Sequence, residues 1–439
     1  MLIGLRDMLA AAEKGQYAVI APDFTDFSVV QLLIEQAERL RAPLLLSFSP
    51  GLKYDMTPRQ YARFIRLVRE EAQIASVPLG LHLDHAFTLA DIREAIDIGF
   101  TSVMIDASRE MWEVNIERTC EVVQMAHAAG VAVESELGHV AVGSQYDAQE
   151  DQNDHHGWLT EPDQAVEFVK QTGVDALAVA VGTIHGVYTG EPILDFKRLE
   201  TIHQMVDIPL VLHGASGTGP ENLRKAVKLG IRKINVFSEL VQTLRSELLT
   251  GLQADPSFHT MAHKRKAVRQ VMDLYLEASG SIGVVKDQPV GLVSRVNELF
   301  NNGYACSESV FLAFAERGGF ASDIALQSLS MFLGGLCLKG ETCGALMGAL
   351  AVIGAVQSSI NPVDKTRRET AITTGKACID WFQQEMGTTC CRTLTGINLN
   401  DPEERQSFKD QQIGPKVCIP ALEKTTRWLI KNLEGFKDE

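Results

Sequence analysis

Three histidines in this chain stand where short apolar runs end. His85 closes the run Leu-His-Leu-Asp-His, His185 follows Val-Gly-Thr-Ile, and His213 follows Pro-Leu-Val-Leu. Imidazole nitrogens are common ligands of Zn²⁺, and a catalytic zinc ion keeps one coordination position free for substrate. A single histidine in such a place is more often hydrogen-bonded than bound to metal. Taken together, however, the three predict a zinc site at one end of a parallel sheet.

A carboxylate stands beside the first of these histidines. Asp84 directly precedes His85, and a turn at the end of a strand can bring both side chains to the same mouth. There Asp84 would serve as a general acid/base beside a metal-bound substrate. The alternative is a carboxylate that only orients an imidazole ligand. His82 alternates with Asp84 and fits an orienting position better than that of a fourth ligand.

Glycines and small polar residues follow the second and third histidines and the last apolar run. The residues of this kind are Gly186, Gly214, Ser216, Asn235 and Ser238. Backbone N–H groups freed by glycine, small hydroxyls and the start of a following helix bind phosphate without needing a lysine. The two serines are also ordinary helix N-cap residues, and both interpretations can hold at once.

The elements that must position these residues alternate regularly up to about residue 245. Eight apolar runs read as strands, at residues 17–22, 43–48, 79–83, 102–105, 131–137, 176–181, 210–212 and 233–237. Segments with helical periodicity lie between them, and several end at glycine. We therefore predict an α/β fold, a (β/α)₈ TIM barrel whose site residues stand at the carboxyl ends of the strands. A doubly wound open sheet is the alternative.

Composition narrows the class of protein. The formal net charge is −15, which argues against nucleic acid as the main partner because a phosphate polymer needs a basic surface. We find no apolar run long enough to span a membrane, and the first residues do not read as a secretory signal. We therefore expect a cytoplasmic protein without a membrane partner.

The rest of the chain has a different composition. Seven of the eight cysteines lie beyond residue 300, where helical patterns replace the alternation of strands and helices. A stretch rich in glycine and serine at 278–283 reads as a linker. We predict two domains, 1–285 and 286–439, the second all-α and cysteine-rich. In a cytosolic protein such clustered cysteines are read first as metal-binding or redox-active.

Four of these cysteines are the candidates for redox chemistry or for a metal or Fe–S cluster. They are Cys306, Cys343, Cys391 and Cys418. Cys343 precedes Gly344 and a helical run, and a helix N-terminus favours the thiolate. Such thiolates could bind metal or exchange as a dithiol pair. Cys337 and Cys378 are predicted to be core residues, and Cys120 a buried helix residue.

The first 245 residues resemble the class II, metal-dependent ketose-bisphosphate aldolases, especially their tagatose-bisphosphate branch. The likeness is carried by residues 82–85, 102–108, 133–138, 172–186, 209–217 and 233–236. By resemblance, His85, His185 and His213 bind zinc, with Glu136 as an alternate or outer ligand. Asp84 exchanges the proton of the C4 hydroxyl. The glycines and polar residues named above for phosphate would hold the phosphate of the substrate.

The chain also departs from the family pattern. The family's acidic base on a glycine-rich loop is replaced by Ser144 or Gln145, and Asp147 or Glu150 could reach in instead. Asp23 stands in place of an asparagine, and Arg109 in place of a histidine. Residues from about 290 to 435 resemble a second family, named C_GCAxxG_C_C for its cysteines, to which a redox role is attributed.

These observations give two hypotheses. The first is a zinc-dependent aldolase that cleaves or condenses a phosphorylated ketose, with dihydroxyacetone phosphate as one product and a redox or metal-binding domain appended. The resemblance implies a homo-oligomer, a dimer or tetramer. The alternative is a non-catalytic or diverged sugar-phosphate-binding protein with a redox or electron-transfer role. The replaced loop acid and the clustered thiols keep this alternative open.

Overall fold

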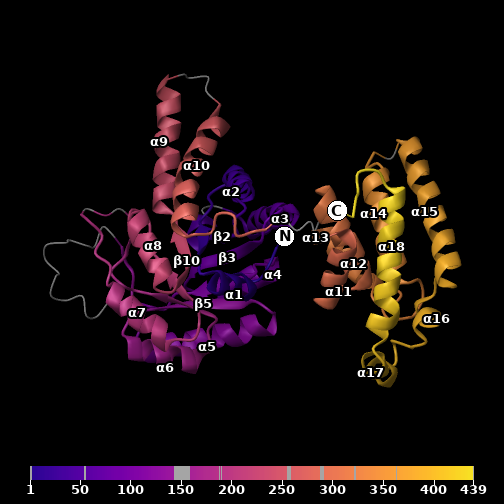
Figure 1. Ribbon diagram of the computed structural model, residues 1–439, viewed down its shortest axis with the longest axis horizontal. Coiled ribbons are helices and arrows are strands. Elements are labelled where there is room, and N and C mark those ends of the chain that lie inside the picture. Colours follow the sequence, from indigo (N-terminus) through magenta and orange to yellow (C-terminus); the bar gives the residue numbers. More distant parts are fainter. Residues whose placement is uncertain are drawn as a thin grey trace. The chain divides into compact units, whose positions relative to one another are not determined.

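The computed structural model describes residues 2–438 except 54–55, 143–158, 187, 189, 255–258, 287–290, 321–322 and 362. It divides into two compact units, Met1–Lys286 and Asp287–Glu439 (Figure 1).

The first unit is a closed parallel barrel. Its strands are β1 (Val19–Pro22), β2 (Leu44–Phe48), β3 (Leu79–Ala86), β4 (Ser102–Ile105), β5 (Ala132–Leu137), β7 (Ala176–Val179), β9 (Leu210–Leu212) and β10 (Ile231–Val236). They pair in the order β1-β10-β9-β7-β5-β4-β3-β2. The predicted (β/α)₈ barrel is confirmed, and the doubly wound open sheet is wrong because the sheet closes on itself. A short parallel pair, β6 (Ala141–Val142) and β8 (Ile184–His185), lies outside the barrel sheet.

The strands read as apolar runs because both of their faces are covered. Every residue of β2 is buried, for example, and the same holds for β7 and β10. Inside the barrel, small residues such as Ala176 and Ala178 pack with α1 (Leu5–Gly15) in one apolar cluster. The apolar residues of α1 therefore shield interior strand residues from solvent. This helix has no counterpart among the predicted helices.

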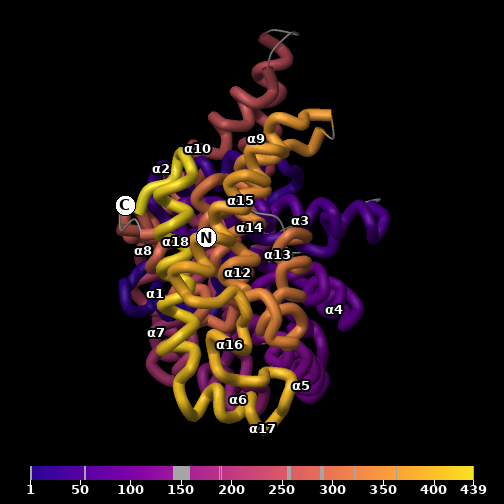
Figure 2. Tube along the Cα trace, turned by 90° about the vertical axis from the view of Figure 1, so that its right-hand side faces the viewer, coloured from indigo at the N-terminus to yellow at the C-terminus, as the bar shows by residue number. Residues whose placement is uncertain are grey.

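The outer helices are α2 (Phe27–Leu40), η1 (Pro50–Lys53), α3 (Pro58–Ile74), α4 (Leu89–Ile98), α5 (Trp112–Ala128), α6 (Pro162–Thr172), α7 (Phe196–Met205), α8 (Pro220–Lys228), α9 (Ser238–Ala254) and α10 (Thr260–Ala278). The helices α9 and α10 form a hairpin that extends beyond the barrel (Figure 2). The predicted linker at 278–283 is wrong. Ser279 and Ser281 are buried there, and the N–H of Gly283 donates to the carbonyl of Leu40, so this segment packs on the barrel.

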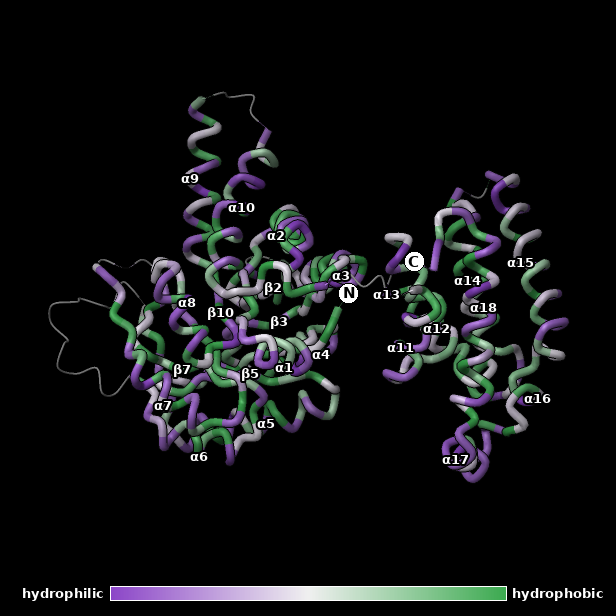
Figure 3. The backbone as a smooth tube through the Cα atoms, in the orientation of Figure 1, coloured by the Kyte–Doolittle hydropathy of each residue, from purple (hydrophilic) through white to green (hydrophobic). Residues whose placement is uncertain are grey.

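The second unit is helical, as predicted. Its helices are α11 (Leu292–Asn301), α12 (Cys306–Gly318), α13 (Asp323–Leu329), η4 (Ser330–Phe332), α14 (Gly344–Gln357), α15 (Lys365–Met386), α16 (Cys391–Thr395), α17 (Pro402–Asp410), the π-helical turn η5 (Gly414–Cys418) and α18 (Ile419–Asn432). Much of α12 and α14 is hydrophobic (Figure 3). Cys378 is buried as predicted, whereas Cys337 is exposed in a loop and Cys120 is partly exposed on α5. No helix among the described residues is long and apolar enough to cross a membrane.

Candidate metal and phosphate site

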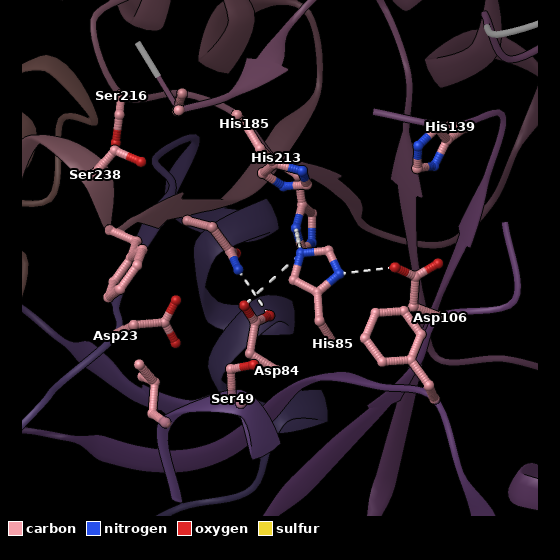
Figure 4. A pocket seen from close by; sticks show the side chains of 18 of the residues that line it. Asp23, Ser49, Asp84, His85, Asp106, His139, His185, His213, Ser216 and Ser238 are labelled. Atoms are coloured by element: carbon pink, nitrogen blue, oxygen red, sulfur yellow. Dashed lines mark hydrogen bonds and ion pairs between the residues drawn. The ribbon is translucent and has the colours of Figure 1, made fainter. Parts of the chain in front are cut away.

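The three histidines meet at the carboxyl end of the barrel (Figure 4). His85 lies near the end of β3, His185 ends β8 and His213 directly follows β9. The ring centroid of His85 lies 4.9 Å from that of His185 and 4.6 Å from that of His213. A break in the register between β3 and β4 surrounds His85, whose φ of 44° is left-handed. Such an irregularity redirects a side chain at the rim of a barrel.

Carboxylates fix the orientation of two of these rings. His85 Nδ1 lies 2.9 Å from an oxygen of Asp106, and His213 Nε2 lies 2.8 Å from an oxygen of Glu134. The remaining nitrogens, His85 Nε2 and His213 Nδ1, face each other at 2.9 Å. If the carboxylates accept N–H bonds, both facing nitrogens of neutral rings carry lone pairs. A cation bound by both nitrogens relieves the repulsion between these lone pairs, so this donor set fits a zinc ion.

The charges around the trio also favour a cation. Burial lowers the pKa of His85, but Asp84 and the hydrogen bond to Asp106 outweigh burial and raise that pKa to about 10. For His185, burial and the charge of His85 lower the pKa to about 4. Among the described residues, the ligand atoms of His85, His185 and His213 all lie within 4.8 Å of one another. One imidazole therefore holds a positive charge at the place where a metal ion would bind.

Glu136 lies behind this trio and is fully buried. A carboxylate oxygen of Glu136 falls within 4.8 Å of ligand atoms of His85 and Asp106. Its Oε1 accepts the N–H of Val140 at 3.0 Å, and its Oε2 has no hydrogen-bond partner among the described residues. The orphaned oxygen is free to accept a metal ion, which fits the alternate or outer ligand that the resemblance implies.

A buried ion-pair network supports the trio from inside the barrel, and the sequence did not reveal it. Lys233 Nζ donates to Glu134 Oε1 at 2.9 Å and lies 3.3 Å from His82 Nε2. Burial raises the pKa of Glu134, but Lys233, His213 and His82 together outweigh burial and lower that pKa to about 2. Burial and Lys233 lower the pKa of His82 to about 3, so His82 is a neutral partner in this network. In the sequence, the only sign of this ion-pair network was a lysine within an apolar strand.

Asp84 lines the cavity beside the trio, as predicted for a general base. Its Oδ1 accepts the side-chain N–H of Asn235 at 2.8 Å, and its Oδ2 lies 3.9 Å from His85 Nε2. Burial raises the pKa of Asp84, but the charges of His85 and His213 outweigh burial and lower it. The pKa of the neighbouring Asp23 is raised well above its usual range, by burial and then by the charge of Asp84. The pKa values of these two neighbouring carboxyl groups are therefore shifted in opposite directions.

The cavity has a volume of about 360 Å³. All five residues predicted to bind phosphate line it: Gly186, Gly214, Ser216, Asn235 and Ser238. Gly214 has a φ of 64°, and a Cβ there would lie 2.6 Å from the carbonyl oxygen of Ile184, so glycine is required. The hydroxyl of Ser216 accepts the N–H of Glu239 at 3.3 Å, near the start of α9. Ser216 is not an N-cap residue as predicted, since the N-cap of α8 is Gly219, but its hydroxyl lines the cavity and bonds to the first turn of α9.

Arg109 and His139 line the same cavity. The Nε–H of the exposed Arg109 side chain donates to His139 Nε2 at 3.1 Å. Figure 4 shows Ser216 and Ser238 on one side of the three histidines and His139 on the other. Sequence reasoning noted Arg109 only as a departure from a pattern. The predicted loop residues Ser144, Gln145, Asp147 and Glu150 lie outside the described residues.

The cysteine candidates all lie in the second unit and at the beginnings of helices. Cys306 opens α12, Cys343 is the N-cap of α14, Cys391 opens α16, and Cys418 ends the π-helical turn before α18. All four are free thiols. Burial and neighbouring thiols raise the pKa of Cys306 and of Cys391 to about 12. The pKa of Cys390, by contrast, is lowered by its hydrogen bonds with Thr393.

The first unit is a closed parallel barrel whose polar side chains gather at the carboxyl ends of the strands. These features place it in the class of (β/α)₈ proteins that bind small molecules at this end. Residues 3–284 match a family model described as "Fructose-bisphosphate aldolase class-II", and residues 304–431 match one described as "Putative redox-active protein (C_GCAxxG_C_C)". The chain therefore belongs to the class II fructose-bisphosphate aldolase family, with a C_GCAxxG_C_C domain appended.

Solved structures agree with this assignment. The YdjI aldolase from Escherichia coli K12 is 34% identical, covers 65% of this chain and is covered over 100% of its own length, with a TM-score of 0.57. A structure from Coccidioides immitis, titled a "putative fructose-1,6-biphosphate aldolase", is 29% identical over 63% of this chain and 96% of its own, with a TM-score of 0.54. Both resemble the barrel unit in length.

We predict that Asp106→Asn weakens metal binding by roughly 10–100-fold, because the substitution removes the carboxylate that orients His85. Titration of metal-free protein with Zn²⁺ against a competing chelator measures this change. Asp97→Asn, an exposed carboxylate on α4, is the matched control and should leave the affinity unchanged. Equal affinities for all three proteins would show that Asp106 does not support the ligand.

We predict that Asp23→Asn extends activity toward higher pH. Because the pKa of Asp23 is raised, a second negative charge forms beside Asp84 only as the pH rises through that raised pKa. Asparagine cannot ionise, so the variant should retain kcat/KM at pH values where the wild-type value falls. Superimposable pH profiles of the two proteins for cleavage would contradict a role for the raised pKa of Asp23.

Proposed function

We propose that the barrel is a zinc-dependent aldolase that cleaves or condenses a phosphorylated ketose, with dihydroxyacetone phosphate as one product. The observation that carries this proposal is the meeting of the histidine trio, Asp84 and the five phosphate candidates in one cavity. The family assignment supports aldolase chemistry in general. The identity of the substrate and that of the metal go beyond the family assignment.

His85, His185 and His213 would hold the metal ion, with Glu136 behind them as the alternate ligand. Zinc bound there supplies positive charge that stabilises the negative charge left on the substrate when the bond between C3 and C4 breaks. Asp106 and Glu134 keep the imidazoles in the tautomers that leave one nitrogen of each ring available. Lys233 in turn holds Glu134 in place.

Asp84 is placed to take the proton of the C4 hydroxyl as the bond breaks. Its pKa is lowered, so the carboxylate is ionised and able to accept a proton, and Asn235 fixes one of its oxygens. Proton transfer to a positioned side chain contributes about 10²–10⁴-fold to the rate. In condensation, a second base must remove a proton from dihydroxyacetone phosphate. The acids predicted for that step lie outside the described residues.

The two sides of the cavity suit the two ends of a phosphorylated sugar. Ser216, Ser238 and the glycines beside them would hold one phosphate, since backbone N–H groups and hydroxyls bind phosphate without a lysine. Arg109 lies with His139 on the other side of the trio and would meet the far end of the substrate. A guanidinium there favours an anionic group, such as a second phosphate, through charge-assisted hydrogen bonds.

The central test is Asp84→Asn. In the presence of zinc, the wild-type protein should cleave at least one member of a panel of phosphorylated ketoses, and the variant should lose about 10²–10⁴-fold in kcat. Metal content and ligand binding of the variant should stay unchanged, because no predicted ligand is altered. Asp97→Asn is the control. Wild-type protein that binds sugar phosphates but cleaves none of them would instead support the non-catalytic alternative.

We predict that Arg109→Ala changes substrate selectivity. Loss of a hydrogen bond to a charged group costs about 1.5–3 kcal/mol, so kcat/KM should fall at least about 10-fold for ketoses that carry a second phosphate. Ketose 1-phosphates without that group should be cleaved at wild-type rates. Arg93→Ala, an exposed arginine on α4, controls for the loss of surface charge. A uniform decrease across both substrate types would contradict the recognition role of Arg109.

A further inference from the structure

The second unit brings four cysteines from distant parts of the chain to one place. Cys306 packs directly against Gly344, because a Cβ on that glycine would lie 2.3 Å from the Cys306 sulfur. The N–H of Cys343 donates to the carbonyl of Thr389 at 2.8 Å, and the N–H of Cys391 donates to that of Glu341 at 2.6 Å. These bonds join the segments before α14 and α16, so three of the cysteines are tied to one another through the backbone.

The fourth cysteine arrives through helix packing. The helices α12, α14 and α18 contact one another, and α16 contacts the π-helical turn that ends at Cys418. Burial and then the neighbouring thiols of Cys306, Cys343 and Cys391 raise the pKa of Cys418, in keeping with this helix packing. Single π-helical turns within helices are rare and occur frequently at functional sites.

Backbone N–H groups oppose the effect of burial on two of the sulfurs. Those of Ser307 and Gly334 act to lower the pKa of Cys306, and those of Ala345 and Leu346 act to lower that of Cys343, although burial raises both pKa values overall. Residues 334–338 all have φ between 52° and 71°, a left-handed turn that includes three non-glycine residues. Hydrogen bonds to cysteine sulfurs are one of the means by which proteins tune iron–sulfur clusters.

From this arrangement we propose that Cys306, Cys343, Cys391 and Cys418 bind an iron–sulfur cluster. The spacing favours a cluster over a single zinc ion. A tetrahedral Zn²⁺ with Zn–S bonds of about 2.3 Å holds its sulfurs about 3.8 Å apart. Among the described residues, the trios of ligand atoms that lie within 4.8 Å of one another all belong to the barrel, and no trio of cysteine sulfurs does. A four-iron cluster, in which each cysteine sulfur binds a different iron atom, accommodates wider spacing.

Burial argues against a dithiol that exchanges with other thiols. Exchange requires that an attacking thiolate reach the sulfur, yet the exposed fraction of Cys343 and of Cys391 is only 6%. Iron and sulfide are far smaller than a thiolate carried by another protein, and two of the four cysteines, Cys306 and Cys418, are partly exposed to them. Each cysteine thiol then releases its proton to solvent as its sulfur binds iron. This proposal does not depend on the function proposed for the barrel.

The test uses the full chain, purified without oxygen and also reconstituted with sulfide and equal amounts of ferrous and ferric iron. We expect iron and acid-labile sulfide in equal amounts, with visible absorption that bleaches on reduction by dithionite. Cys306→Ala, Cys343→Ala, Cys391→Ala and Cys418→Ala should each lower bound iron at least 10-fold. Cys337→Ala is the matched control, since this exposed thiol of the same unit lies outside the site, and it should retain full iron.

Three results would overturn the proposal. The first is that wild-type protein takes up no iron even after reconstitution. The second is that the four cysteines of each chain bind a single zinc ion. The third is a disulfide between two of these cysteines in protein purified without oxygen. Each measurement on wild-type protein is independent of whether a variant folds. Circular dichroism of the variants separates loss of the cluster from loss of the helical unit.

Discussion

The site depends on the balance of buried charge at the carboxyl end of the barrel. Asp84, Asp106, Glu134 and Glu136 are buried there, and the pKa of each is lowered, so all four are negatively charged at neutral pH. Lys233 and a protonated His85 provide two positive charges against these four. Buried charges are stable only when they are paired or bind metal. A divalent ion on the histidine trio would displace the proton of His85 and bring the sum closer to neutrality.

This balance explains why the barrel carries a lysine in its interior. Removing one member of a buried pair leaves an unpaired charge and costs about 3–5 kcal/mol, so Lys233 and Glu134 require each other. Glu134 also holds His213, and through that ring it sets which nitrogen faces the metal position. Stability of the barrel and geometry of the metal site therefore rest on the same carboxylate. The raised pKa of Asp23 favours its neutral form and so limits the negative charge beside Asp84.

The barrel and the meeting of the three histidines followed from the sequence because both rest on local patterns. Apolar runs of buried strands are continuous, and residues that follow such runs in a closed barrel must gather at one end. Lys233 and Glu134 could not be interpreted in this way, since their roles depend on neighbours from distant strands. The 278–283 segment was read as a linker from its glycine and serine content, although it packs on the barrel. Cys337 was predicted to be a core residue because its spacing fits an apolar helix face. It lies instead in a left-handed turn, which such spacing does not reveal.

The two units apply one principle to different ligands. In the barrel, carboxylates fix imidazole rings so that their free nitrogens converge, and in the helical unit backbone N–H groups act to lower the pKa of two of the four cysteines. In both cases the ligand residues stand out in the sequence, whereas the groups that orient them do not. The reason is physical: a ligand must be a particular residue type, but an orienting group can come from any segment that the fold brings near. Gly344 shows the limit of this freedom, because only its missing side chain leaves room for the Cys306 sulfur.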